Sequence, residues 1–127
     1  GRSAFWIAEL NEKGAIGQVF LQYNSHRQDL ANGFDLAYLF SFRIKPDFRN
    51  HGIGSRLLYQ VENELHKRSF MEISLIVSRK NLRAIQFYQH HGYTIVAPES
   101  GEWTFEDHRN HRLRIQEPGW KMTKKIL

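Results

Sequence analysis

The chain contains no cysteine among its 127 residues. This absence excludes a disulfide framework and a zinc site built from thiolates. No run of apolar residues approaches the length of about 18 that a membrane-spanning helix needs, so no membrane span is expected. The first residues show no basic segment followed by an apolar one, so no secretory signal is expected either.

The composition predicts one small domain, residues 1–127. Hydrophobic residues make up 41% of the chain and aromatic residues 13%, which suffices for a single core at this length but hardly for two. The net charge of +5 suits a polyanionic ligand, either a phosphorylated cofactor or a nucleic acid. The basic residues are scattered and no nucleic-acid recognition module is visible, so nucleic acid is the least favoured partner.

A glycine-containing turn between a strand and a helix is the most informative stretch. Residues 49–54 are Arg-Asn-His-Gly-Ile-Gly. Upstream, residues 36–44 are rich in aromatic and other β-favouring residues and stop before Pro46, which predicts a strand. Downstream, apolar residues recur at helical spacing from Ile53 to Leu65, which predicts a helix. Because glycine allows close backbone approach and a helix start attracts anions, this stretch predicts a site for a phosphorylated ligand.

Two common phosphate-binding motifs are absent. The chain has no Gly-x-x-x-x-Gly-Lys-Ser/Thr pattern, which excludes a P-loop. A dinucleotide fingerprint fails because Leu57 stands where the third glycine would follow Gly52 and Gly54. A plain structural helix entry therefore stays open if this stretch is considered alone.

A second helix with both ends marked follows the apolar run 73–77. Asn81 is a good N-cap residue, and Gly92 is a good residue just beyond the C-terminus. Between them the sequence is Leu-Arg-Ala-Ile-Gln-Phe-Tyr-Gln-His-His. The two segments, in this order, resemble the GNAT superfamily of acyl-CoA-dependent N-acetyltransferases. The family's pyrophosphate motif Arg/Gln-x-x-Gly-x-Gly/Ala is matched by Arg49, Gly52 and Gly54. Its later motif Asn-x-x-Ala-x-x-x-Tyr-x-x-x-Gly-Phe/Tyr is matched by Asn81, Ala84, Tyr88, Gly92 and Tyr93.

The resemblance covers roughly residue 5 to the C-terminus and implies an α/β (α+β) fold. We expect a mixed, mostly antiparallel central sheet with helices on its faces. Strands 36–44 and 73–77 should form a splayed parallel pair, and strands 93–96 and 119–125 a closing antiparallel pair. The chain opens at what looks like the family's second strand, so the domain is expected to be N-terminally incomplete, without the usual first strand and two helices. The first helix is expected to end at Arg68-Ser69, where the family often has glycine.

The resemblance also implies the residues of a cofactor site. Backbone groups on the splayed strand would contact the pantetheine of coenzyme A, namely those of Phe42, Arg43 and Ile44. The turn and helix start would hold the pyrophosphate through Arg49, Asn50, His51, Gly52, Ile53, Gly54 and Ser55. On the second helix, Asn81 and Arg83 are the further cofactor residues, and Tyr88 is the catalytic candidate that assists the departing thiolate. No metal is expected.

Several assignments stay open. The general base is Glu9, Asp35 or a water. Arg79, Lys80 and Arg83 either meet a cofactor phosphate or are ordinary solvated charges. The pair His108 and His111 lacks a further ligand that would favour a metal site, and His90 and His91 are explained by the helix C-terminus. The acidic residues of the long segment 99–118 could attract a cationic acceptor; they are Glu99, Glu102, Glu106, Asp107 and Glu117.

The function implied by the resemblance is acetyl transfer from acetyl-CoA to a primary amine in the cytoplasm, by a monomer or a homodimer. Without cysteine no thiol acyl-enzyme can form, so the transfer would most simply be direct. The alternative is a non-catalytic acyl-CoA-binding or sensing module that keeps the phosphate site and has no turnover.

Overall fold

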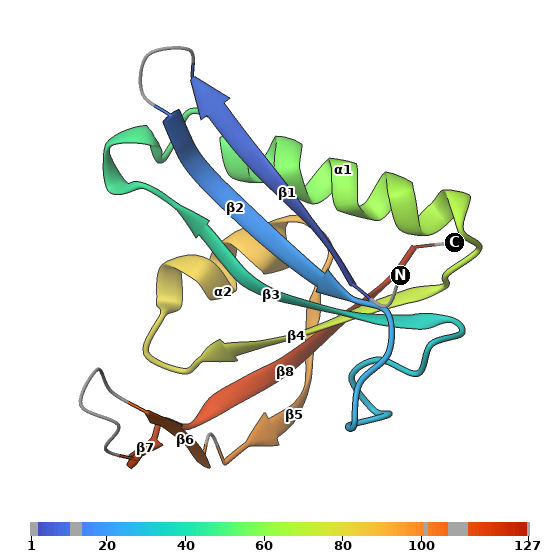
Figure 1. Cartoon of the computed structure of the whole chain (residues 1–127), viewed down its shortest axis with the longest axis vertical. Coiled ribbons are helices and arrows are strands. Elements are labelled where there is room, and N and C mark those ends of the chain that lie inside the picture. Colours follow the sequence, from blue (N-terminus) through green and yellow to red (C-terminus); the bar gives the residue numbers. More distant parts are fainter. Residues whose placement is uncertain (1–2, 11–13, 101, 107–111, 127) are drawn as a thin grey trace. The chain divides into compact units, whose positions relative to one another are not determined.

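The computed structural model describes residues 3–10, 14–100, 102–106 and 112–126 (Figure 1). The chain divides into two compact units. The first contains residues 1–75 with 125–127, and the second contains residues 76–124. Strand β4 contributes residues to both units, and the strand order of the main sheet is β1-β2-β3-β4-β8-β5. Within the described residues, no helix is long and apolar enough to cross a membrane.

The first unit is built on a sheet with one long helix. Its elements are β1 (Ser3–Leu10), β2 (Gly14–Gln22), β3 (Leu36–Ile44), the 3-10 turn η1 (Pro46–Phe48), α1 (Ile53–Lys67) and the start of β4 (Glu72–Ser78). The pairs β1–β2 and β2–β3 are antiparallel. A short parallel ladder joins Leu36–Tyr38 of β3 to Glu72–Ser74 of β4. The expected parallel pair is therefore present.

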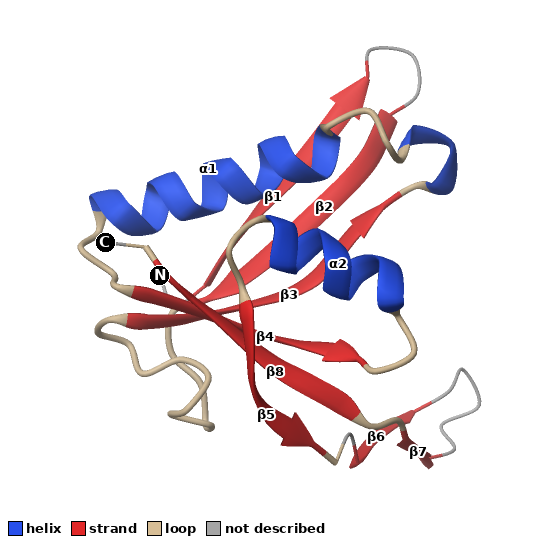
Figure 2. Cartoon of the chain, turned by 180° about the vertical axis from the view of Figure 1, so that it is seen from behind, coloured by secondary structure: helices blue, strands red, loops and turns tan. Residues whose placement is uncertain are grey.

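Helix α1 covers one face of this sheet, and Figure 2 shows it running along β1 and β2. Alternation along β2 points Val19 and Leu21 to the covered face, where both are fully buried. The helix contributes Leu58, Val61 and Leu65 at helical spacing, and all three are buried. Each such side chain stabilises the fold by roughly 1.5–3 kcal/mol relative to exposure. The core of the unit thus forms where the buried positions of β2, at every second residue, meet those of α1, at every third or fourth residue.

The opposite face of the sheet carries a row of aromatic rings. Phe5, Phe20 and Phe40 lie on facing positions of three adjacent strands, with ring centroids 5.6 Å apart in each neighbouring pair. Tyr38 stacks on Phe40 at the same spacing, 5.6 Å. The two cross-strand pairs, Phe5–Phe20 and Phe20–Phe40, reinforce the register of the three strands.

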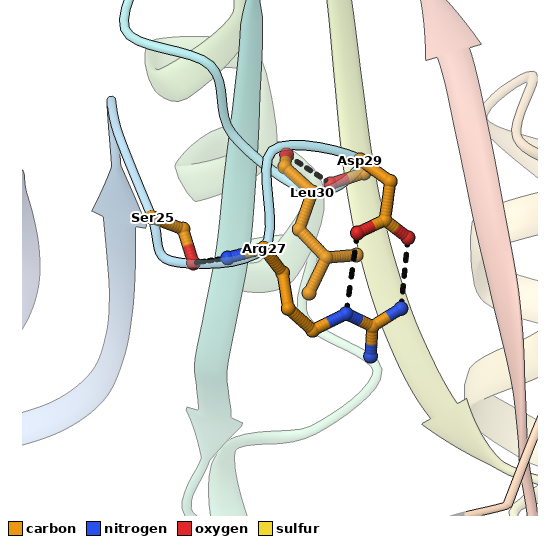
Figure 3. Close-up of polar contacts among 5 residues, drawn as sticks. Ser25, Arg27, Asp29 and Leu30 are labelled. Atoms are coloured by element: carbon orange, nitrogen blue, oxygen red, sulfur yellow. Dashed lines mark hydrogen bonds and ion pairs between the residues drawn. The ribbon is translucent and has the colours of Figure 1, made fainter.

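The connection between β2 and β3 is stabilised by an ion pair and hydrogen bonds among its own residues. Arg27 and Asp29 form a two-bond ion pair at 3.2 and 2.8 Å (Figure 3). Asn32 accepts the backbone N–H groups of three residues, Phe34, Asp35 and Leu36. The amide of Asn32 also donates to the Asp35 carboxylate at 2.7 Å. Asparagine favours such turns because its side chain satisfies nearby backbone groups.

This connection is anchored to the core at Leu30. The Leu30 side chain is only 4% exposed, and its carbonyl accepts a hydrogen bond from Ser74 Oγ at 2.6 Å. Ser74 itself is fully buried on β4. A buried hydroxyl with a partner is stable in a core, whereas an unpaired one is costly. Ser74 thus ties the β2–β3 connection to β4.

The second unit contains the rest of β4 followed by one helix and four strands. These are α2 (Leu82–His90), β5 (Thr94–Glu99), β6 (Glu102–Glu106), β7 (Arg112–Gln116) and β8 (Gly119–Lys125). Strand β5 pairs with β8 antiparallel, as expected from the sequence. A Cβ at Gly119 would lie 2.8 Å from the Val77 carbonyl oxygen, so only glycine fits where β8 begins.

The segment 99–118 differs from the expectation of a polar excursion. It contains the antiparallel pair β6–β7, which forms a separate two-stranded sheet. The expected elements on either side are present with bounds shifted by a few residues. The fold class deduced from the sequence, a mixed and mostly antiparallel sheet with one parallel pair and helices, is confirmed.

Candidate functional site

A β-bulge interrupts β3 at Ser41. Phe20 of β2 faces Phe40 of β3, and Gln18 faces Arg43. Between these two pairs, the single residue Val19 on β2 lies opposite two residues on β3, Ser41 and Phe42. Ser41 has a φ of 49°, in the left-handed region that non-glycine residues rarely adopt. A bulge bends the strand and redirects its backbone groups. It lies beyond the last rung of the parallel β3–β4 ladder at Tyr38.

The three residues expected to contact pantetheine begin in this bulge with Phe42 and continue to Ile44. Phe42 and Ile44 are half-buried, and Arg43 is exposed. The segment was predictable from the sequence but the bulge was not, because serine carries no signature of a left-handed conformation. A glycine at position 41 would have revealed it.

The turn after β3 is held closed by Arg49. Its Nε donates to the Ile44 carbonyl at 3.1 Å, and its backbone N–H donates to the Pro46 carbonyl at 3.3 Å. The η1 turn between these residues is stabilised by Phe48 N–H donating to the Lys45 carbonyl at 2.9 Å. Arg49 thus connects the end of the strand to the segment that leads into the helix.

Gly52 is the N-cap of α1 and adopts a left-handed conformation, with φ 78° and ψ 4°. It offers no side-chain cap, and the helical ladder begins with the Arg56 N–H donating to the Gly52 carbonyl at 3.1 Å. The N–H groups of Ile53 and Gly54 precede that bond, so the ladder itself gives them no acceptor. A Cβ added to Gly52 would meet no atom within 4 Å. The helix start is therefore open to an approaching anion, which its dipole would favour.

The segment around this helix start is rich in cations. Between residues 43 and 56 there are four Arg or Lys residues against one acidic residue, Asp47. All four cationic residues are exposed; they are Arg43, Lys45, Arg49 and Arg56. His51 is also exposed, and Asn50 has a φ of 66°, a value that asparagine tolerates better than most residues. Ser55 is half-buried in the first turn of the helix. The surface is suited to several phosphate charges.

The α2 helix has the ends expected from the sequence. Asn81 Oδ1 accepts the Ala84 N–H at 3.2 Å, which is a standard N-cap bond. Gly92 has a φ of 94° just beyond the helix. Arg83, near the start of the helix, is exposed. Asn81 and Arg83 therefore occupy the helix N-terminus that the resemblance assigns to the cofactor.

Tyr88 is largely packed within the second unit. It is 8% exposed, and its ring meets those of Tyr93 and Phe87 edge-on, with centroid distances of 5.7 and 5.5 Å. A buried ring with a small exposed fraction suits either a core residue or a catalytic hydroxyl at the rim of a site. The catalytic role of Tyr88 stays a prediction.

Arg79 interacts with β8, which favours a structural role for it. Its Nε donates to the Gly119 carbonyl at 3.1 Å, and its guanidinium carbon lies 4.0 Å from the centroid of the Trp120 ring. Arg79 was one of three cations considered for a cofactor phosphate. All three are exposed, and Lys80 and Arg83 remain candidates for that role.

The two acidic candidates for a general base differ in their surroundings. Asp35 accepts the Asn32 amide, and its backbone carbonyl accepts the N–H groups of Met71 and Glu72. These bonds give Asp35 a clear structural role in joining β3 to β4. Glu9 is exposed on β1, next to an irregularity in the β1–β2 register. The identity of the base stays open.

The remaining histidine and acidic candidates lie at the end of α2 and in the segment 99–118. The N–H of His91, the C-cap of α2, donates to the carbonyls of Phe87 and Tyr88, and its ring lies 4.6 Å from that of Phe87. Asp107, His108 and His111 lie outside the described residues, as do the side chains of Glu102 and Glu106. In the described part of the chain, no group of three His, Asp or Glu side chains could hold a metal ion.

Ten of the twelve expected cofactor residues lie between residues 42 and 55, all in the first unit. The bulge, the Arg49 turn and the α1 start belong to the first unit, whereas Asn81, Arg83 and Tyr88 belong to the second. Within the first unit, a redirected strand backbone is followed closely along the chain by an anion-attracting helix start. Redirected strand groups are a feature suited to amides of a ligand, and an open helix start is a feature suited to phosphates.

Comparison with known proteins finds a family and individual proteins that are similar to this chain. Residues 1–93 match the acetyltransferase (GNAT) family. The [ribosomal protein bS18]-alanine N-acetyltransferase of Escherichia coli is 36% identical over 59 residues, covering 46% of this chain and 40% of the relative. The spermidine N(1)-acetyltransferase of Thermoplasma acidophilum is 27% identical over 77 residues, covering 61% of this chain and 46% of the relative. The chain thus spans less than half the length of both curated relatives.

Solved structures share the fold. A GNAT family acetyltransferase from Elizabethkingia anophelis, solved with acetyl-CoA bound, superposes with a TM-score of 0.73. The match covers 98% of this chain and 76% of that one, at 15% sequence identity. At this level of identity the likeness establishes the fold alone.

Proposed function

The chain belongs to the GNAT family of acetyltransferases, and we propose that it transfers an acetyl group from acetyl-CoA directly to a primary amine. The observation that carries the proposal is the start of α1. A left-handed glycine N-cap, open space where a Cβ would stand, and a cation-rich surround together suit the pyrophosphate of coenzyme A.

The residues present fit the rest of this co-substrate. Pantetheine contains two amide groups, which an extended strand with redirected backbone groups can bind. The bulge at Ser41 supplies such a segment in Phe42–Ile44. Asn81 and Arg83 at the α2 start are the proposed further contacts, with the exposed Arg83 proposed to meet a phosphate.

The proposed chemistry requires few protein groups. The amine nitrogen attacks the thioester carbonyl carbon, the carbon–sulfur bond breaks, and the coenzyme A thiolate leaves. Negative charge grows on the carbonyl oxygen during attack, and a backbone N–H of the bulged strand would stabilise it. Losing one donor of this kind typically lowers the rate about 10²–10³-fold.

Tyr88 is proposed to assist the leaving thiolate. Phenols are weaker acids than thiols, so early transfer of the phenol proton would be uphill. A hydrogen bond from the hydroxyl to the growing thiolate charge avoids this cost. The proton released by the amine leaves through a base, for which Glu9, Asp35 and water are the candidates.

The acceptor is proposed to be a primary amine because both named relatives act on amines of different kinds, an alanine of a ribosomal protein and spermidine. We place the reaction in the cytoplasm, where acetyl-CoA is available. A second candidate is a module that binds acyl-CoA without turnover, since the 8% exposure of Tyr88 also suits a core residue with no catalytic role.

Two measurements on the 127-residue chain separate these functions. Calorimetry with coenzyme A tests the phosphate site, and thiol release from acetyl-CoA across a panel of primary amines tests transfer. We expect saturable binding and amine-dependent thiol release above the rate of hydrolysis without amine. Binding without amine-dependent release would identify the non-catalytic module. Absence of binding would refute both functions.

A further inference from the structure

We propose that Gln18 is a positioning residue for acetyl transfer, because its side chain holds the β3 bulge in the conformation that turns the backbone of Phe42 toward the thioester. The inference rests on the proposed function. It adds a residue of β2 that lies in neither of the two sequence motifs.

The strain at Ser41 makes an external support necessary. With a φ of 49°, Ser41 stands in a region where the side chain of an L-residue crowds its own backbone. Such conformations persist when neighbouring groups over-determine them, and they gather at functional sites. The Gln18 side chain is such a neighbour, since its Nε2 donates to the Ser41 carbonyl oxygen at 3.2 Å.

The position of Gln18 in the ladder explains why it can act this way. It faces Arg43 on the rung that follows the bulge, and the next rung of β2 pairs Phe20 with Phe40. Its side chain therefore reaches back across the bulge to the carbonyl of the strained residue. In a regular antiparallel ladder, backbone hydrogen bonds to the facing strand would set the direction of that carbonyl instead.

The η1 turn separates the segments that are proposed to bind the two ends of the co-substrate, and the bulge lies next to only one of them. Phe42, Arg43 and Ile44 begin within the bulge and are the proposed contacts of pantetheine and the thioester. The pyrophosphate is assigned to the α1 start at Gly52, beyond the η1 turn. Relaxation of the bulge should therefore disturb the reacting end of acetyl-CoA and leave the phosphate end in place.

Gln18→Met tests this role, because methionine keeps the length of the side chain and removes the donor. Gln22→Met is the matched control. Gln22 lies on the same face of β2 with the same intermediate exposure, but it faces Tyr38 on a regular rung. We expect Gln18→Met to lower kcat roughly two- to tenfold, the change that corresponds to one neutral hydrogen bond. The Kd for coenzyme A should weaken by a smaller factor than kcat falls, because the pyrophosphate site is unchanged, and Gln22→Met should alter neither value.

A rescue variant separates positioning from general stability. Glycine adopts a positive φ without steric cost, so Ser41→Gly removes the strain that Gln18 compensates. In the Ser41→Gly background, Gln18→Met should lose much less activity than in the wild type. The amide ¹H–¹⁵N signal of Phe42 should shift in Gln18→Met and move back in the double variant.

The outcomes distinguish this inference from the proposed function. Coenzyme A binding with amine-dependent turnover in the wild type supports the function by itself. The positioning role is refuted if the kcat of Gln18→Met then equals that of the wild type. It is also refuted if Gln18→Met lowers kcat by the same factor in the wild type and in the Ser41→Gly background. An equal loss in Gln22→Met would also refute it, because the effect would be general to β2. A wild type that neither binds nor turns over would overturn both.

Discussion

Replacing Gly52 by alanine tests the phosphate site with an unusually close control in the same chain. Gly52 has a φ of 78° and Gly14 a φ of 68°, and a Cβ added at either position would meet no atom within 4 Å. The two substitutions therefore impose the same kind of backbone strain without a packing clash. They differ in location, since Gly52 is the N-cap of α1 and Gly14 begins β2.

The effect on stability should be similar for the two variants. Placing an L-residue in the left-handed region costs roughly 1–2 kcal/mol. The smaller conformational freedom of alanine in the unfolded chain offsets about 0.4–1 kcal/mol of this cost. We therefore expect a net loss of about 1 kcal/mol in the free energy of unfolding for each variant, measured by urea denaturation.

The effect on binding should differ sharply. The alanine methyl at position 52 would project into the open space where the pyrophosphate is proposed to lie, and relief of strain would rotate the N–H groups of Ile53 and Gly54. A hydrogen bond to a charged group contributes about 1.5–3 kcal/mol, so the loss of one corresponds to a roughly ten- to hundredfold weaker Kd. Calorimetry with coenzyme A should show this loss for Gly52→Ala alone. Equal Kd values for Gly52→Ala and Gly14→Ala, both folded, would refute the phosphate site.

The elements around this site were predictable because several local signals agree there. The strand 36–44, the α1 periodicity and the caps Asn81 and Gly92 each point to the same structure that the backbone adopts. A glycine was also correctly taken to mark the N-terminus of α1. Agreement between propensity, periodicity and capping is what makes a local prediction secure.

The left-handed conformations of two serines could not be predicted, because the residue type gives no sign of them. Ser41 and Ser69 have φ values of 49° and 64°, yet serine is common in ordinary strands and helices. Their conformations depend on partners distant in the sequence or on the end of a helix. The β6–β7 hairpin, by contrast, does have a signal in the sequence, although the segment was expected to be a polar excursion. Apolar residues alternate in Glu-Trp-Thr-Phe-Glu and in Arg-Leu-Arg-Ile-Gln, the period of a strand.

Three further predictions follow from the described contacts. If Lys80 and Arg83 meet the 3′-phosphate, then changing both to Gln should weaken coenzyme A more than dephospho-coenzyme A in calorimetry; equal losses would return them to the solvated surface. Ser69→Gly should raise the free energy of unfolding by about 1 kcal/mol, because glycine accepts the left-handed position after α1 without strain; an unchanged urea midpoint would contradict this. Tyr88→Phe should lower kcat roughly ten- to a thousandfold with little change in KM for acetyl-CoA, since acid or hydrogen-bond assistance contributes up to about 10²–10⁴-fold. Tyr93→Phe is the control, because Tyr93 is also buried, at 1% exposure, and packs against the Tyr88 ring. The same loss of kcat in both variants would attribute the effect to packing, and a Tyr88→Phe enzyme as fast as wild type would leave thiolate release to water or backbone donors.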